Sequence, residues 1–307
     1  MKSVPTFSII IPTFRRPKQL TDCLTAVAAL EYRPDRFEVI IVDDGSPEPL
    51  DAIVRPFRDR LDVSLIRKTN SGPGSARNVG ATVARGKFFA FTDDDCSPAS
   101  DWLQKLEGGF CKDARRLIGG RVVNMLSHNL YSTTSQIIVD IAYAYYNRNP
   151  EDARFFASNN IAVPAAPFWE LGGFDGNFRV ASEDREFCDR WVHGGYKMSY
   201  APDAVVFHAH SLTLRSFCQQ HFNYGRGAGQ FHRVRTLRGS GRLVRELKFH
   251  AHFLQLLRKP LSHLPRERAL PICALLVLWQ LVNAAGFLYE TGRLLSGSAI
   301  NSNTLVR

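Results

Sequence analysis

The segment Lys87-Phe88-Phe89-Ala90-Phe91-Thr92-Asp93-Asp94-Asp95 decides the expected fold, because an apolar strand in it runs directly into three acidic residues. Two similar stretches precede it. Glu38-Val39-Ile40-Ile41-Val42 leads into Asp43-Asp44-Gly45-Ser46, and Ser8-Ile9-Ile10-Ile11 leads into Pro12-Thr13-Phe14. Such short apolar runs are typical of strands buried on both faces. Helical patterns separate the runs, which predicts parallel pairing and a doubly wound α/β sheet.

Further along the chain the pattern predicts several other elements. Val63–Ile66 and Val205–Phe207 are expected to be strands. Helices are expected at four places: from about Pro17, from the Gly72-Pro73-Gly74 loop to about Ala84, near Thr133–Tyr146 and from about Ser182. Beyond Leu212 the chain is expected to be helical and basic.

Polar clusters follow three of the predicted strands at the point where each strand ends. In open parallel sheets, ligands bind beyond the carboxyl ends of the strands, where the strand order reverses. Asp44, Asp93, Asp94 and Asp95 are therefore expected to line one crevice.

Three successive aspartates repel one another in a partly buried site, so they need a cation, hydrogen-bond donors or protonation. Oxygen ligands suit Mg²⁺ or Mn²⁺, usually with substrate phosphates as further ligands. The alternative is that Asp93–Asp95 only form a turn before Ser97-Pro98, where Asp is common. The run of three after an aromatic strand favours a metal site.

The loop Asn70–Asn78 is glycine-rich and precedes a predicted helix. Such loops offer backbone N–H groups and the positive end of the helix dipole to phosphate. It is a weak dinucleotide motif, because Arg77 stands where a third small residue would be expected. An arginine there could pair with a diphosphate through two hydrogen bonds.

The chain has 307 residues, of which 45% are apolar, and a formal net charge of +10, which suits a globular protein with an anionic partner. Between Arg226 and Arg268 there are eleven Lys or Arg and two acidic residues. The six cysteines form no C-x-x-C pair, and the N-terminus shows no signal-peptide pattern. A cytoplasmic protein is expected, associated with the cytoplasmic face of a membrane.

The segment 269–289 contains no charged residue and is long enough to span a bilayer. Pro271, Gln280, Asn283 and Gly286 make it only moderately apolar. A helix in the membrane interface and a core helix are therefore equally open interpretations. The basic stretch before it suits an anionic lipid surface, or is a solvated face.

Several quoted segments together resemble the family 2 inverting glycosyltransferases of the GT-A fold. They are Ser8-Ile-Ile-Ile-Pro-Thr-Phe, Val42-Asp-Asp-Gly-Ser, Ala76-Arg-Asn-Val-Gly, Thr92-Asp-Asp-Asp, and Gly172-Gly-Phe-Asp followed by Glu183-Asp184. The resemblance covers about residues 6 to 212. It implies a mixed, mostly parallel sheet flanked by helices, with a nucleotide-sugar-binding half at 1–115 and an acceptor-binding half at 116–212. Residues 213–307 are expected to form a basic, helical, membrane-associated extension that contains the apolar segment 269–289.

The resemblance also implies roles for individual residues. Pro12 and Phe14 would line the nucleobase, Asp44 would hydrogen-bond it, and Arg77 would help hold the nucleotide. Within the D-x-D element Asp93–Asp95, the metal would be Mn²⁺ or Mg²⁺, with Asp95 as ligand and Asp94 on the ribose. His208 is the best match for a histidine ligand, and His210 remains an alternative.

Glu183-Asp184 matches the family's acidic pair that carries the catalytic base. Adjacent helical residues point about 100° apart, so only one should face the crevice. By the motif this is Asp184, with Glu183 orienting it. The helix dipole is expected to keep Asp184 ionised. The alternative is that both acids only decorate a helix N-terminus.

The Q-x-x-R-W element of processive family members is absent, which favours addition of a single sugar. Gly225-Arg226-Gly227 is interpreted as a mobile loop that closes over the donor phosphates.

The predicted activity is transfer from a nucleotide-diphosphate sugar, with uridine as the expected base, to a glycan or lipid-linked acceptor. Two alternatives remain: a metal-dependent nucleotidyltransferase, and a non-enzymatic binder of membrane surface or nucleic acid. Strand-end aspartates argue against nucleic acid, because they repel phosphate.

Overall fold

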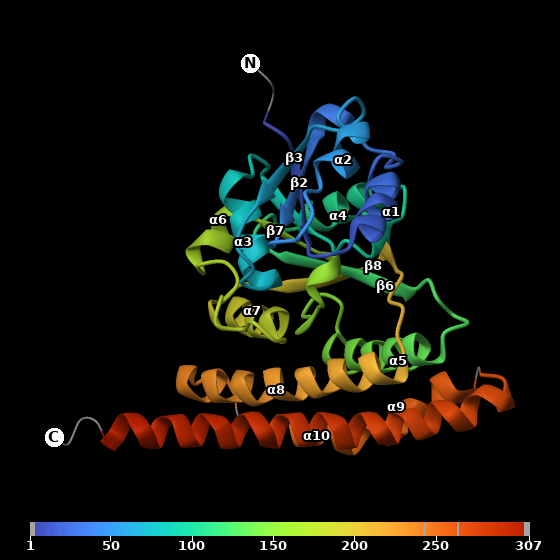
Figure 1. Cartoon of the computed structure of the whole chain (residues 1–307), viewed down its shortest axis with the longest axis vertical. Coiled ribbons are helices and arrows are strands. Elements are labelled where there is room, and N and C mark those ends of the chain that lie inside the picture. The colour runs from blue at the N-terminus through green and yellow to red at the C-terminus, as the bar shows by residue number, and fades with distance from the viewer. Residues whose placement is uncertain (1–3, 242–243, 263, 304–307) are drawn as a thin grey trace.

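A mixed sheet of eight strands forms the centre of the molecule (Figure 1), as seen in a computed structural model that describes residues 4–241, 244–262 and 264–303. The strand order is β3-β2-β1-β4-β7-β6-β8-β5. β3, β2, β1 and β4 run parallel, β7 is antiparallel to both of its neighbours, and β6 and β8 are parallel. The strands are β1 (Phe7–Thr13), β2 (Phe37–Asp43), β3 (Val63–Arg67), β4 (Phe88–Phe91), β5 (Cys96–Pro98), β6 (Leu117–Asn124), β7 (Ile161–Pro164) and β8 (Met198–His208).

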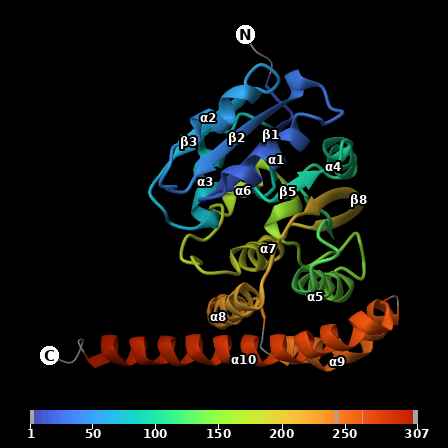
Figure 2. The same ribbon diagram turned by 45° about the vertical axis from the view of Figure 1, so that its right-hand side comes forward.

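Helices cover both faces of the sheet, and three more lie at one end of the molecule (Figures 1 and 2). The helices are α1 (Pro17–Val27), α2 (Asp51–Val54), α3 (Pro73–Val83), α4 (Trp102–Phe110), α5 (Leu130–Tyr146), α6 (Ala165–Glu170), α7 (Glu183–His193), α8 (Leu214–Arg238), α9 (Val244–Ser262) and α10 (Arg266–Asn303). The fold confirms the expected mixed, mostly parallel α/β architecture with a helical C-terminal region.

The alternation of side chains along the strands divides the core into two layers. In β1, Ile9 and Ile11 pack into a cluster with residues of α1 and α4. Ile10 faces the opposite way, into a cluster with residues of α3, α6 and α7. α3 lies close to the sheet because it presents Gly80, where a Cβ would come within 2.6 Å of Ile10 Cγ2. The apolar runs therefore form strands because both of their faces are covered.

β8 is longer than the predicted Val205–Phe207, since it begins at Met198. Its register with β6 shifts between Gly120 and Arg121, whose partners are Ala201 and Val205. The residues between these partners form an irregularity that includes an exposed Pro-Asp pair, and this pair hides the strand from a pattern search. Asn160 fills the irregularity, because its amide donates to the backbone oxygens of Arg121 and Ala204 at 2.9 Å each.

The C-terminal helices build a third apolar cluster with α5, which contains Ile141, Phe217, Phe253 and Trp279. The prediction that Gly225-Arg226-Gly227 forms a mobile loop is wrong, because these residues lie inside α8. Glycine occurs there for close packing, and a Cβ on Gly225 would lie 2.0 Å from the backbone oxygen of Asn283 in α10.

The apolar segment 269–289 lies within α10, and the helical stretch Arg266–Ser296 has a mean hydropathy of 1.8 with 28% of its apolar window buried. By length and composition it could cross a membrane. The division into units at residues 115 and 212 stays a prediction, and one sheet runs through the first two.

Candidate active site

Two of the three aspartates after β4, Asp94 and Asp95, receive hydrogen bonds from the end of β1 and the loop that follows it. The Thr13 hydroxyl donates to Asp94 Oδ2 at 2.7 Å. Arg16 Nη1 donates to Asp94 Oδ1 at 3.1 Å and to Asp95 Oδ2 at 2.8 Å. Asp93 has the most exposed carboxylate of the three, at 30% against 4% for Asp94 and 9% for Asp95. The roles of Thr13 and Arg16 were not predicted, although Thr13 ends β1, the strand that pairs with β4, and Arg16 follows it.

The protein itself offsets much of the repulsion among these acids. Burial raises the pKa of Asp94 to about 6, although the charge of Arg16 and the hydrogen bond from Thr13 oppose this shift. For Asp95, burial acts in the same direction, but the hydrogen bond and charge of His208 outweigh it and lower the pKa. The repulsion among the three aspartates is therefore smaller than their sequence implies, and it does not by itself require a metal ion.

The positions of Asp95, Cys96 and His208 favour a site for a divalent cation. β5 pairs with β8 so that Cys96 stands opposite His208. His208 Nε2 lies 3.2 Å from Asp95 Oδ1, and the ligand atoms of Asp95, Cys96 and His208 lie within 4.8 Å of one another. Burial raises the pKa of the Cys96 thiol well above its usual range, which disfavours the thiolate form that binds metals. The carboxylate and the imidazole fit Mn²⁺ or Mg²⁺ with phosphate co-ligands.

His210, the alternative histidine, stacks its ring on that of His208 with 4.8 Å between centroids. Burial, with help from the charge of His208, lowers the pKa of His210 to about 4. The pKa of His208 is raised, because the hydrogen bond and charge of Asp95 outweigh the effect of burial. His208 is thus the histidine in direct contact with the D-x-D element, and His210 lies behind it.

Arg77 joins the metal motif to the start of α7. Its guanidinium donates to Asp93 Oδ1 at 2.6 Å and to Glu183 Oε1 at 3.0 Å, and its side chain is 2% exposed. Both carboxylates hold Arg77 inside the protein. Its expected contact with nucleotide would require one of these ion pairs to open.

The backbone turns sharply just before the acidic pair. Ser182 adopts a left-handed conformation with φ of 72°, and α7 begins at the next residue. Glu183 points to Arg77, whereas Asp184 Oδ1 accepts from the backbone N–H of Arg185 at 2.7 Å. The two carboxylates therefore point different ways, as expected from helical geometry.

The expectation that the helix dipole keeps Asp184 ionised is wrong. Burial of this carboxyl and the like charge of Glu183 raise its pKa to about 7. The backbone hydrogen bonds from Arg185 and Ser158 and the charge of Arg77 act in the opposite direction but do not offset the loss of hydration. A carboxyl that titrates near neutral pH suits a general base.

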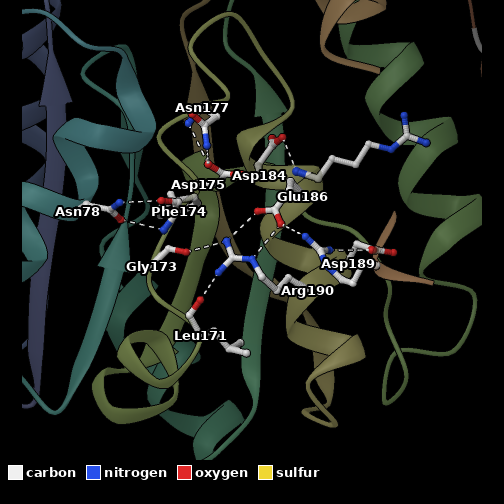
Figure 3. Close-up of polar contacts among 12 residues, drawn as sticks. Asn78, Leu171, Gly173, Phe174, Asp175, Asn177, Asp184, Glu186, Asp189 and Arg190 are labelled. Carbon is white, nitrogen blue, oxygen red and sulfur yellow. Dashed lines mark hydrogen bonds and ion pairs between the residues drawn. The ribbon is translucent and has the colours of Figure 1, made fainter. Parts of the chain in front are cut away.

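The Gly172–Asp175 turn and α7 form one polar unit (Figure 3). Asn78 of α3 accepts from Phe174 N at 2.8 Å and donates to Phe174 O at 2.7 Å. Arg190 donates to the carbonyl oxygens of Leu171 and Gly173 and to Glu186. These contacts show why an Asn follows Arg77, a structural role that was not predicted.

Asp44 organises the loop before α3. It accepts from the backbone N–H groups of Ser71 at 3.0 Å and Gly72 at 2.8 Å, and from Lys68 Nζ at 2.7 Å. Near it, Pro12 is buried and the Phe14 ring is 37% exposed. Phe14 is thus accessible to a ring ligand, while Asp44 already has three donors.

The predicted site residues lie along the carboxyl ends of β1, β2, β4 and β8, and at the start of α7. Arg16 joins Asp94 to Asp95, and Arg77 of α3 joins Asp93 to Glu183. The hydrogen bonds of Asp44 go instead to the loop before α3, and that of Asp184 goes to the backbone of Arg185. The fold and this cluster of acids at strand ends define an α/β transferase of the GT-A type.

Residues 8–172 match the sequence profile of "Glycosyl transferase family 2". The chain belongs to this family and is a glycosyltransferase. The match decides against the nucleotidyltransferase and the non-enzymatic alternatives.

Named relatives agree with this assignment. Glycosyltransferase AglE of Haloferax volcanii is 25% identical over 228 residues, which cover 73% of each chain. The pre-mycofactocin glycosyltransferase of Mycobacterium tuberculosis is 27% identical over 72% of this chain and 46% of its own length, so the chain spans about half of that relative.

Solved structures share the fold. The mannosyltransferase PcManGT from Pyrobaculum calidifontis, in complex with GDP-Man and Mn²⁺, has a TM-score of 0.64, 20% identity, and coverage of 97% of this chain and 81% of its own. Staphylococcus aureus TarS 1-349 in complex with UDP-GlcNAc has a TM-score of 0.55, 17% identity, and coverage of 95% of this chain and 92% of its own.

Proposed function

We propose that this glycosyltransferase moves a single sugar from a nucleoside-diphosphate sugar to an acceptor hydroxyl, with inversion at the anomeric carbon. One observation carries the proposal. A carboxyl with a pKa of about 7, Asp184, lies beside Glu183, which Arg77 joins to Asp93 of the D-x-D element. An ion-paired arginine thus links the neighbour of the proposed base to the residues that would hold the diphosphate.

In the proposed reaction, Asp184 takes the proton from the acceptor hydroxyl as its oxygen attacks the anomeric carbon. The C–O bond to the nucleoside diphosphate breaks as the new one forms, and attack from the opposite side inverts the configuration. Glu183 raises the proton affinity of Asp184 through its charge.

Asp93, Asp95 and His208 would hold Mn²⁺ or Mg²⁺, which offsets charge on the departing diphosphate. Arg16 contacts Asp95 and the neighbouring Asp94 and is about half exposed, so it is free to turn away when a cation binds. Arg77 stays in place because it is fully enclosed.

For the donor, Phe14 and Pro12 would contact the nucleobase, Asp44 would hydrogen-bond it, and Asp94 would contact the ribose. We propose uridine as the base. TarS of S. aureus, whose structure is known with UDP-GlcNAc, is 37% identical to this chain over 91 residues, which cover 29% of this chain. GDP-Man in the P. calidifontis protein is the competing choice.

The acceptor is proposed to be a hydroxyl of a glycan or a lipid-linked glycan, in cell-envelope polysaccharide or glycolipid synthesis on the cytoplasmic face of the membrane. The basic, apolar C-terminal region supports an acceptor at a membrane surface.

Asp184→Asn tests the proposed base. Transfer is expected to fall by at least about a hundredfold, because the amide cannot accept the proton, while the donor Kd stays within about threefold. Release of nucleoside diphosphate is followed across UDP- and GDP-sugars with Mn²⁺, Mg²⁺ or a chelator. Asp203→Asn, in the exposed irregularity of β8, is the matched control.

Near-normal transfer by Asp184→Asn contradicts the assignment. Loss of both donor binding and transfer would instead place Asp184 in the donor site. Retained activity in the chelator contradicts the metal proposal.

A further inference from the structure

α10 has two apolar faces on opposite sides. Leu270, Val277, Leu281, Leu288 and Leu295 form what we call the outer face, and each is more than 60% exposed. At 100° per residue these five positions lie within about 40° of one another around the helix. With a rise of 1.5 Å per residue, the outer face is about 38 Å long.

The inner face of α10 packs against the rest of the protein. Ile272, Leu275, Leu276 and Trp279 are each less than 9% exposed and belong to the third apolar cluster. Burial of this side secures the helix on the protein, so the outer face is left for another apolar partner. An exposed apolar surface of this length is unusual for a protein that only meets water.

We propose that α10 lies in the plane of a membrane, with its outer face inserted in the interface of an anionic lipid bilayer. Figures 1 and 2 show α10 as the lowest element, stretched along the base of the molecule beneath α8. An in-plane helix exposed to lipid on one face needs this position at the edge of the protein.

The packing of α8 on α10 argues against a membrane-spanning helix. A Cβ on Gly286 would lie 2.0 Å from the backbone oxygen of Phe222, so the two backbones touch. Farther along, Arg226 Nε donates to Glu290 Oε2 at 2.9 Å, and Glu290 is 3% exposed. If α10 crossed a bilayer as packed, α8 would carry Arg226 and several polar residues into hydrocarbon, at high cost.

The basic residues of the C-terminal helices favour an anionic lipid surface, rather than a second copy of the chain, as the partner of the outer face. Arg258 of α9 is exposed, and so is Arg266 at the N-terminal end of α10. They belong to the segment with eleven basic and two acidic residues between Arg226 and Arg268. Anionic headgroups attract such a segment, whereas self-association through α10 would add a second, equally basic one.

The test is sedimentation with preformed phosphatidylcholine vesicles, with and without phosphatidylglycerol, in the absence of any sugar nucleotide. The full chain is expected to bind the anionic vesicles. Leu281→Asp/Leu288→Asp is expected to lower this binding at least about tenfold, because it places charge in the inserted face. Val83→Asp/Val4→Asp is the matched control, since both valines are exposed in the α/β part.

Equal binding by the Leu281→Asp/Leu288→Asp protein overturns the proposal, provided that its circular dichroism and thermal transition match those of the parent. A concentration-dependent dimer in lipid-free solution that these substitutions abolish also overturns it, in favour of a second copy. None of these readouts requires catalysis, so they are independent of the proposed reaction.

Topology is tested with Arg266→Cys and Ser296→Cys, each in a Cys111→Ser/Cys218→Ser/Cys273→Ser background, and a membrane-impermeant maleimide. An in-plane helix leaves both ends on the outside, so detergent is expected not to increase the labelling of either. Labelling of one end only after detergent would show a spanning helix and overturn the proposal.

Discussion

Asp184 illustrates how burial tunes a single carboxyl. Loss of hydration raises its pKa first, and the charge of Glu183 raises it further. Arg77 and a backbone N–H of Ser158 act in the opposite direction but do not compensate. The groups that act on this carboxyl come from several elements: Glu183 and Arg185 of α7, Arg77 of α3, and Ser158.

The pH profile of kcat follows from this environment. A base must be deprotonated, so kcat is expected to rise with pH and reach half its plateau near pH 7. In Glu183→Gln a like charge is lost and Arg77 acts more strongly on Asp184, so the midpoint is expected to fall by about one pH unit. The measurement is kcat from pH 5 to 9 at saturating donor.

Glu48→Gln, at an exposed position, controls for a general effect of the same substitution. An unchanged or higher midpoint in Glu183→Gln would show that Glu183 does not set the pKa of the base.

At the scale of elements, α8 supports the turn that presents Asp184. A Cβ on Gly227 would lie 2.6 Å from both the backbone oxygen of Ala181 and the hydroxyl of Ser182. Ser182 has a φ of 72°, so this turn has little freedom to adjust. α7 is further tied to α8 by Arg238, which contacts Glu186 and Asp189.

Gly227→Ala is therefore expected to move the start of α7 and lower kcat by about tenfold, while donor Kd changes little. The measurements are kcat and the donor Kd, and a fall in kcat without a matching change in Kd is the expected result. Gly108→Ala, in α4, is the matched control because nothing lies within 4 Å of its added Cβ. Parent-like kcat in Gly227→Ala would show that α8 does not position the base.

At the scale of the whole molecule, most of the net positive charge lies outside the part that carries the proposed active site. The segment from Arg226 to Arg268 holds most of the +10 net charge, and it lies in the helices beneath the α/β part (Figure 1). The strand-end acids and the basic C-terminal helices therefore lie in different parts of the molecule.

Vesicle binding is accordingly expected to weaken as salt screens the basic segment. Arg258→Ser/Arg266→Ser is expected to reduce affinity for anionic vesicles by about tenfold at low salt and to flatten the salt dependence. Lys18→Ser/Arg33→Ser removes the same charge from the α/β part and is expected to have no effect. Equal losses in both variants would show a response to net charge alone.

The sequence alone predicted the strands around Ile10, Ile40 and Phe91, because continuous apolar runs between helical patterns permit few other folds. It also predicted that the strand-end acids meet, because parallel strands present their carboxyl ends at one edge. Ordered motifs identified the family, which the profile match confirmed.

Contacts between residues far apart in the chain determine two features that local sequence patterns did not predict correctly. Glycines at 225 and 227 look like a loop, but α10 and the Ser182 turn lie too close to α8 for any side chain there. A carboxyl at a helix N-terminus looks ionised, but burial, which depends on residues far away in the chain, raises the pKa of Asp184. Burial and close approach belong to the assembled chain, so only the tertiary structure could decide them.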